Sequence, residues 1–339
     1  MRVLLTGHQG YLGTVMTPVL TAAGHEVVGL DSGLFADCVL GPEPADPPGH
    51  RLDLRDVPAG LLDGFDAVIH LAALSNDPLG ALAPELTYAI NQTASVRLAR
   101  LAKDAGVRRF LYASTCSVYG ASGGDELLDE DAPLRPVTPY AESKVRVEDE
   151  LSELADADFS PVSMRNATAF GFSPRLRADI VLNNLVGHAH LTGVVRVLSD
   201  GTPWRPLVHV ADIAEAFAAA LVAPREAVHD RAFNVGGEQN NLTVAEIAEH
   251  VVEAVPGAGL LITGESGADP RSYRVDFSRI RAALPGFHAR WTVKEGAVEL
   301  AAAYRRHGLT ADGFERRFTR LARLADRRAD GTVDPELRA

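Results

Sequence analysis

Cysteines, strongly basic segments and long apolar runs are all scarce in this chain of 339 residues. Its two cysteines, Cys38 and Cys116, are too few for a disulfide framework or a zinc site, so we expect a reducing compartment and no metal. No apolar run reaches the roughly 20 residues that cross a bilayer, and residues 1–6 form a strand pattern rather than a signal peptide. We therefore expect a cytoplasmic protein without a membrane partner.

The chain also lacks a cluster of lysines and arginines of the nucleic-acid-binding type, and its formal net charge is −12. A charge of this sign repels phosphate backbones, so we expect no nucleic-acid partner. Small anionic ligands are still compatible with it, because local arginines and helix N-termini can outweigh the net charge. Hydrophobic residues make up 46% of the sequence, which is ordinary for a globular protein with a packed core.

Short apolar runs alternate with helical patterns in the first half of the chain. This alternation predicts an α/β fold with a doubly wound parallel Rossmann sheet. The expected strands are Arg2–Thr6, Glu26–Asp31, Ala67–His70, Arg109–Ser114 and Pro161–Asn166, and the expected helices are Tyr11–Ala23, Glu85–Ala105 and Pro139–Leu154.

The regular alternation of strand and helix patterns ends after residue 167, where we expect a smaller mixed α/β substrate lobe. Residues 1–167 would form the Rossmann domain, with returns to it near 205–236, and residues 168–204 and 237–310 would form the lobe. Within the returns, short strands are expected at 205–208 and 232–235. Residues 311–328 predict one amphipathic helix, and the polar tail after it is expected to fray.

A glycine-rich turn follows the first expected strand directly and opens the first expected helix. Gly7, Gly10 and Gly13 in this position let the backbone approach a pyrophosphate at the helix N-terminus. The second strand ends in Asp31, whose carboxylate can accept hydrogen bonds from both hydroxyls of an adenosine ribose. The same carboxylate would repel a 2′-phosphate, so the sequence favours NAD over NADP.

Further residues complete the expected NAD site. Asp53 follows another strand and is expected to accept a hydrogen bond from the adenine amino group, whereas Asp56 is as well explained as a helix cap. His70 is interpreted as a hydrogen-bonded histidine at a strand end, followed by small residues where the sheet edge passes beneath the cofactor. The other expected cofactor contacts are Tyr11, Leu12, Leu54, Leu71, Ala72, Ala73 and Asn91.

Tyr140 and Lys144 lie four residues apart in an expected helix, so their side chains share one helical face, about 5–6 Å apart at Cβ. A lysine cation near a phenol lowers the pKa of the phenol toward the operating pH, which a base assisting hydride transfer requires. Thr115 follows the fifth expected strand and would emerge at the same sheet edge as the glycine turn. We expect Thr115 to hydrogen-bond the reacting oxygen.

With these motifs the sequence resembles the extended short-chain dehydrogenase/reductase family, in its NAD-dependent nucleotide-sugar epimerase and dehydratase branch, from about Met1 to Arg306. The strings that carry the resemblance are GHQGYLG at Gly7, STCSVYG at Ser114, YAESK at Tyr140 and RPLVHVADIAEAF at Arg205. The resemblance implies that Tyr140 is the general base, that Lys144 positions the nicotinamide ribose, and that Thr115 orients the substrate hydroxyl. It also implies that NAD stays bound through each turnover, and that a homodimer forms through helices 85–105 and 139–154.

The resemblance extends to the substrate side. It implies that Arg205 grips a nucleotide diphosphate and that Asn184 meets the nucleotide, and Arg271 is a candidate for a second phosphate contact. Ser75 and Ser117 are further candidates for substrate binding. Where sugar 4,6-dehydratases of this branch carry an Asp-Glu pair after the threonine, this chain has Cys116 and Ser117, so elimination is disfavoured. Cys116 is either an unusual acid/base group facing the sugar or an inert packing residue.

The leading hypothesis is therefore a nucleotide-sugar epimerase that inverts C4 through a keto-sugar. A nucleotide-sugar dehydratase or ketoreductase of a deoxysugar pathway is the alternative among enzymes. A non-catalytic NAD(H)-binding regulator is the alternative from another class, although such a protein would not need Thr115, Tyr140 and Lys144.

Overall fold

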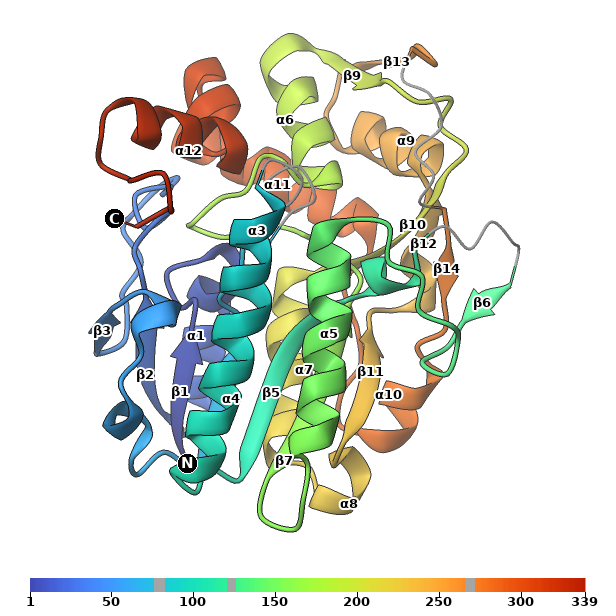
Figure 1. Ribbon diagram of the computed structural model, residues 1–339. Helices are drawn as coiled ribbons and strands as arrows, with labels where there is room; N and C mark the ends of the chain where they lie inside the picture. Colours follow the sequence, from blue (N-terminus) through green and yellow to red (C-terminus); the bar gives the residue numbers. More distant parts are fainter. Residues whose placement is uncertain (76–82, 121–125, 266–271, 339) are drawn as a thin grey trace.

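The computed structural model describes residues 1–75, 83–120, 126–265 and 272–338, and a seven-stranded sheet forms the centre of its larger part (Figure 1). Each strand runs parallel to its neighbours, in the order β11-β7-β5-β4-β1-β2-β3. The strands are β1 Arg2–Thr6, β2 Glu26–Asp31, β3 Gly49–Arg51, β4 Ala67–His70, β5 Arg109–Thr115, β7 Ser160–Asn166 and β11 Arg231–Val235. The predicted doubly wound Rossmann sheet is confirmed.

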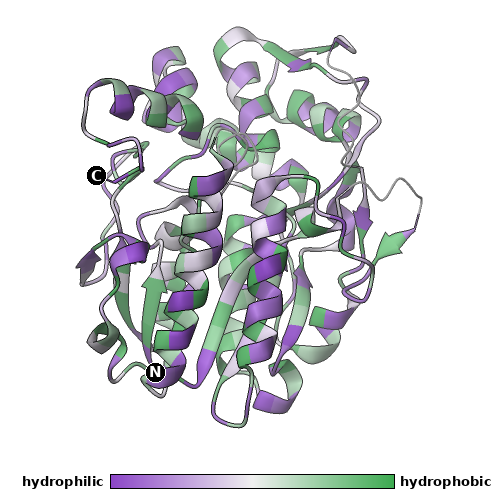
Figure 2. Ribbon diagram, in the orientation of Figure 1, coloured by the Kyte–Doolittle hydropathy of each residue, from purple (hydrophilic) through white to green (hydrophobic). Residues whose placement is uncertain are grey.

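Helices cover both faces of this sheet, which is why β4, β5 and β7 are buried along their whole length. Helices α4 and α5 lie side by side on one face, and α1 and α7 pack together on the other (Figure 1). Alternating purple and green bands on α4 and α5 in Figure 2 show that these helices are amphipathic. The helices of this part are α1 Tyr11–Ala22, α3 Pro84–Thr87, the π-helical η3 Tyr88–Thr93, α4 Ala94–Asp104, α5 Pro139–Leu154, α7 Val210–Val222, α8 Arg225–Val228 and α10 Ser278–Ala283.

Local signals explain where the two long helical segments begin and end. Pro84 and Pro139 occupy first turns, where a missing N–H is harmless, and Thr138 caps α5 by accepting a hydrogen bond from the amide of Ala141. Gly106 follows α4 with a φ of +79°, a conformation that favours glycine. Four short 3-10 helices connect the larger elements: η1 Leu54–Asp56, η2 Ala59–Leu62, η4 Cys116–Tyr119 and η5 Glu238–Asn240.

A smaller lobe with its own apolar core stands above the carboxyl edge of the sheet (Figure 1). One sheet of this lobe contains β8 Thr168–Phe170, β10 Trp204–His209 and β12 Asn241–Thr243. In addition, β9 Val194–Val197 pairs with β13 Gly259–Ile262, and β6 Leu127–Leu128 pairs with β14 Arg274–Val275. Its helices are α6 Val181–Thr192, α9 Val244–Ala254 and α11 Val293–His307. No helix in the described part of the chain is both long and apolar enough to cross a membrane.

The expected return of residues 205–208 to the main sheet is wrong. Strand β10 pairs with β8 and β12 in the smaller lobe, whereas α7, α8 and β11 of the 205–236 segment pack on or join the main sheet. The reason is that a single residue separates the end of β7 from the start of β8 and β10 pairs in parallel with β8, which places β10 beyond the carboxyl end of β7 rather than beside it.

The C-terminal segment also differs from the prediction. Instead of one helix over 311–328 there is a π-helical turn, η6 Gly313–Arg317, and a separate helix, α12 Arg320–Ala329. The expectation that the tail frays is wrong as well, because Val333 and Leu337 are buried in a cluster with Leu34 and Leu324. The segment thus packs against the loop after β2.

Candidate active site

The backbone of the glycine turn packs so closely against its neighbours that a side chain at Gly7 or Gly13 would clash with them. Gly7 has a φ of +76°, and a Cβ on it would lie 2.8 Å from the backbone nitrogen of Ala72. A Cβ on Gly13 would lie 2.3 Å from the carbonyl oxygen of Gly7. Helix α1 begins here without a side-chain cap, so its first amides are available to an anion. These features fit the diphosphate of a dinucleotide.

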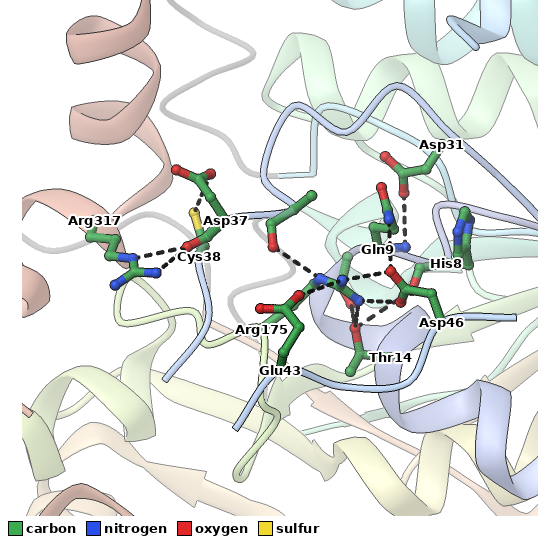
Figure 3. Close-up of polar contacts among 12 residues, drawn as sticks. His8, Gln9, Thr14, Asp31, Asp37, Cys38, Glu43, Asp46, Arg175 and Arg317 are labelled. Atoms are coloured by element: carbon green, nitrogen blue, oxygen red, sulfur yellow. Dashed lines mark hydrogen bonds and ion pairs between the residues drawn. The ribbon is translucent and has the colours of Figure 1, made fainter. Parts of the chain in front are cut away.

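Asp31 stands beside this turn at the end of β2. Its carboxylate accepts hydrogen bonds from the backbone amides of Gln9, at 3.0 Å, and Gly33, at 2.9 Å, which fix its orientation at the cavity wall (Figure 3). Asp53 caps the short helix η1 and forms an ion pair with Arg55 at 2.7 Å, so the cap here is Asp53 rather than Asp56. Both carboxylates line the cavity at positions suited to an adenosine.

His70 is a satisfied interior histidine, as the sequence predicts. Its Nδ1 lies 2.7 Å from Thr6 Oγ1 and its Nε2 lies 2.7 Å from Ser95 Oγ. Thr6 Oγ1 also accepts a hydrogen bond from the amide of Ala72 at 3.3 Å, which joins the histidine to the loop after β4. Burial, with a smaller contribution from the Lys144 charge, lowers the pKa of His70 to about 3. The neutral ring therefore supports the strand end beneath the cavity.

A single cavity of about 780 Å³ joins the glycine turn to the catalytic helix. It is bounded by the carboxyl edge of the main sheet, the smaller lobe and the C-terminal segment. The predicted site residues that line it are Gly7, Gly10, Tyr11, Leu12, Gly13, Asp31, Asp53, Leu54, Leu71, Ala72, Ala73, Ser75, Thr115, Ser117, Tyr140, Lys144, Asn184 and Arg205. Arg271, the second phosphate candidate, lies outside the described residues.

The catalytic candidates meet where β5 ends and α5 begins. Lys144 donates from Nζ to the carbonyl oxygen of Ala113 at 2.7 Å and lies 5.8 Å from the centre of the Tyr140 ring. Burial lowers the pKa of Lys144 to about 7, against the opposing attraction of Glu148. Thr115 holds the next turn by accepting a hydrogen bond from the amide of Ser117 at 3.1 Å. A phenol, a hydroxyl and an amine thus line the same part of the cavity.

Cys116 is not part of this group, so its assignment as a catalytic candidate is wrong. As the first residue of η4 it turns into the core, where it is 1% exposed and donates to the carbonyl oxygen of Arg165 at 3.2 Å. Burial raises the pKa of its thiol well above the ordinary value. The alternative interpretation, an inert packing residue, describes it correctly.

Asn91 does not line the cavity either, so its assignment as a direct cofactor contact is wrong. Its side chain is buried in η3, where it accepts the amide of Leu74 at 2.8 Å and donates to the carbonyl oxygen of Leu74 at 3.1 Å. Both hydrogen bonds fix the loop after β4. Asn91 therefore supports the cavity wall from behind.

Sequence reasoning missed two arginines of the loop between β8 and α6. Arg177 lines the cavity and forms a two-armed ion pair with Asp179, at 3.0 and 2.9 Å. Arg175 is 1% exposed and joins Asp46 to Thr14 of α1, which fastens this loop over the glycine turn (Figure 3). The run Ser-Pro-Arg-Leu-Arg-Ala-Asp at 173–179 is the signal that could have drawn attention to them.

A buried ion pair beneath the catalytic helix was also missed. Glu148 lies four residues after Lys144 on the same face of α5 and pairs with Arg165 at 2.7 Å, both side chains being under a tenth exposed. Glu148 also accepts from the hydroxyl of Ser114 next to Thr115. The spacing Tyr140, Lys144, Glu148 was the available signal, because it repeats at one helical turn.

Fold and site together define an α/β enzyme with a Rossmann sheet, in which a tyrosine and a lysine line the same cavity as a dinucleotide-binding glycine turn. The NAD dependent epimerase/dehydratase family matches residues 3–236, so the chain belongs to this family, and NAD is its cofactor. The chain is 31% identical over 317 residues to a UDP-glucose 4-epimerase of Mycolicibacterium smegmatis, covering 90% of this chain and 99% of the relative. It is 30% identical to a UDP-glucose 4-epimerase of Streptomyces lividans, covering 79% and 86%.

Solved structures agree with this placement. MoeE5 in complex with UDP-glucuronic acid and NAD is 29% identical with a TM-score of 0.77, covering 90% of this chain and 99% of that one. The UDP-glucose 4-epimerase of Stenotrophomonas maltophila, with bound NAD and formylated UDP-arabinopyranose, is 25% identical with a TM-score of 0.79, covering 91% and 99%. An NAD-dependent NDP-hexosamine 5,6-dehydratase, TunA, has a TM-score of 0.80 at 22% identity and shares the fold.

Proposed function

We propose that this protein is an NAD-dependent nucleotide-sugar epimerase that inverts C4 of the sugar through a transient keto-sugar. The observation that carries the proposal is that Tyr140, Thr115 and Lys144 line one cavity with the glycine turn and Asp31. The relatives named as UDP-glucose 4-epimerases support the same reaction. A cytoplasmic location and a homodimer belong to the same proposal.

NAD, when bound, supplies the acceptor and donor of the hydride, and the chain supplies the proton transfer and the alignment. Tyr140 is the general base that takes the hydroxyl proton from the sugar and returns it after inversion. Thr115 donates a hydrogen bond to the reacting oxygen, and Lys144 is held in place by the carbonyl oxygen of Ala113. With a pKa of about 7, the lysine is partly charged at neutral pH and favours the phenolate while so charged.

The carboxylates of the cavity favour epimerisation over elimination. Loss of water from a sugar needs an acid/base pair near the reacting carbons, and the described lining contains Asp31, Asp53 and Asp179. Each of the three is already held, by backbone amides, by Arg55 and by Arg177, respectively. Net reduction with NADPH is disfavoured by Asp31, because its carboxylate would face a 2′-phosphate.

The substrate half of the cavity suits a nucleotide diphosphate. Arg205 lines it from β10, and its guanidinium offers planar, two-armed hydrogen bonding that matches phosphate oxygens. Asn184 of α6 also lines the cavity and donates to the carbonyl oxygen of Ala178 at 3.0 Å. Ser75, which accepts a hydrogen bond from Arg177 at 3.2 Å, and Ser117, next to Thr115 in the turn after β5, also line the cavity and would contact the substrate.

The test is a substrate labelled with deuterium at C4, using UDP-glucose and UDP-glucuronic acid as probes. Inverted product should keep its label, because the hydrogen leaves and returns within one active site. Loss of label to solvent, or a product lighter by one water, contradicts the proposal. Tyr140→Phe should lower turnover by at least about a hundredfold while NAD stays bound. Tyr88→Phe is the matched control, since the Tyr88 hydroxyl bonds Glu142 away from the cavity.

A further inference from the structure

Arg320 is a buried cation at the edge of the cofactor cavity. It is the first residue of α12, is 4% exposed, and lines the cavity together with Thr319 and Leu321. Its guanidinium lies 4.6 Å from the centre of the Phe35 ring. Among the residues that the structure describes, its Nη1 has no hydrogen-bond partner. A buried charge left unsatisfied is costly, so such a group calls for a ligand.

The charged neighbours of Arg320 cancel one another. These neighbours are Arg177 and Asp179, and the thiol of Cys38 is a hydrogen-bond partner. The Asp179 carboxylate is already bound on both oxygens by Arg177, and the Cys38 thiol has a pKa raised by burial. The charge of Arg320 itself is therefore uncompensated and makes this corner of the cavity positive, although the whole chain carries a net charge of −12. An anion with several oxygens is the ligand that such a corner favours.

The position of Arg320 identifies which anion this is. Phe35 follows Asp31 in the loop after β2, which belongs to the adenosine half of the site. Leu321 and Leu337 line the same half together with Leu34. We propose that Arg320 binds the diphosphate of NAD, and that the C-terminal segment 319–337 closes the adenosine half of the cofactor site.

The segment is fastened on both sides of this contact. Arg323 and Arg327 pair with the carboxylate of Asp37. Arg317 donates to the carbonyl oxygen of Asp37 (Figure 3). At the far end, the guanidinium of Arg338 pairs with Asp56. These anchors hold α12 against the loop after β2, so Arg320 is in place before NAD arrives. A cation held in advance loses little entropy when it binds, which favours tight retention of the cofactor.

The experiment measures NAD affinity and stability together in Arg320→Met. Methionine keeps much of the apolar stem and removes the charge. Because Nη1 of Arg320 has no hydrogen-bond partner among the described residues, the NAD-free variant should melt at or above the wild-type temperature. Its NAD affinity should fall at least about tenfold, the scale of a lost charge-assisted hydrogen bond, and bound NAD should exchange faster with labelled NAD. Arg316→Met is the matched control, because Arg316 is exposed and pairs with Asp326 on the same segment.

Each other outcome overturns the proposal. Unchanged NAD affinity with a raised KM for UDP-glucose would assign Arg320 to the substrate diphosphate. Unchanged NAD affinity with a lower melting temperature would make it a structural residue. If the methionine variant does not fold, Arg320→Lys decides: its NAD affinity should fall because the guanidinium fork is lost, and wild-type affinity refutes the proposal. These readouts depend on NAD binding, so they remain valid if the proposed epimerase reaction is wrong.

Discussion

Lowering the pH from 7 to 5 should cost this protein about 2 kcal/mol of unfolding free energy through His70 alone. The pKa of His70 is about 3 in the folded chain, because the ring is buried, and about 6.5 in an unfolded chain. Between these values the unfolded state binds the proton and the folded state does not. The stability is therefore complete above pH 6.5 and is lost progressively as the pH falls toward 3.

Protonation would also force the hydrogen bonds around the ring to change. An imidazolium donates from both nitrogens, so the hydroxyls of Thr6 and Ser95 would both have to accept, although Thr6 Oγ1 already accepts from the amide of Ala72. The loop after β4, which lines the cofactor cavity, depends on that arrangement. Acid should consequently weaken NAD binding together with stability.

The assay is urea unfolding at pH 7 and at pH 5, for the wild type and for His70→Gln. Other groups titrate in this range, so the informative quantity is the difference in pH dependence between the two proteins. The variant should be less stable at pH 7 but should lose about 2 kcal/mol less on acidification. His50→Gln, at an exposed position, is the control and should keep the wild-type pH dependence. Equal pH dependence in His70→Gln and the wild type would refute the reasoning.

Three further predictions concern the cofactor, the buried ion pair and the assembly. Wild-type protein should bind NAD more tightly than NADP in calorimetry, and Asp31→Ala should reduce that preference; equal affinities in the wild type contradict the role of Asp31. Glu148→Ala should lower the free energy of unfolding in urea by about 3–5 kcal/mol, because Arg165 is left buried without its carboxylate. Glu150→Ala, which removes a half-exposed ion pair, is the control and should change the free energy of unfolding by no more than about 0.5 kcal/mol. Light scattering at micromolar concentration should give the mass of a dimer joined through α4 and α5, and a monomer there would exclude it.

The parts of the fold that sequence alone predicts are those whose signals are local. Helix α5 has its observed bounds, Pro139–Leu154, because a threonine cap and a first-turn proline mark its start. Strands β1, β2 and β4 also have the expected bounds, since short apolar runs bounded by turn residues are typical of buried strands. The glycine turn and Tyr140 are placed by these elements, which is why they line one cavity as expected.

The parts that sequence could not predict depend on contacts between distant segments. The direction of Cys116 is set by η4, a single turn whose start depends on Thr115, so the strand pattern before it says nothing about which way the thiol points. Asn91 lies in a helix that looks solvent-facing in sequence, and only the loop after β4 gives its amide partners. The docking of the C-terminal segment rests on arginine pairs with Asp37 and Asp56, which are more than 280 positions away.

An acidic protein can hold an anionic cofactor and an anionic substrate because the relevant charges are local. Exposed charges more than about 8 Å apart are largely screened at physiological ionic strength, so most of the net charge of −12 is not felt inside the cavity. Within it, Arg177, Arg205 and Arg320 come from three separate elements, and one carboxylate of the same region, Asp179, is neutralised by Arg177. Buried pairs are screened far less than exposed ones. NAD retention should therefore depend on these arginines more than on salt concentration or on the net charge of the chain.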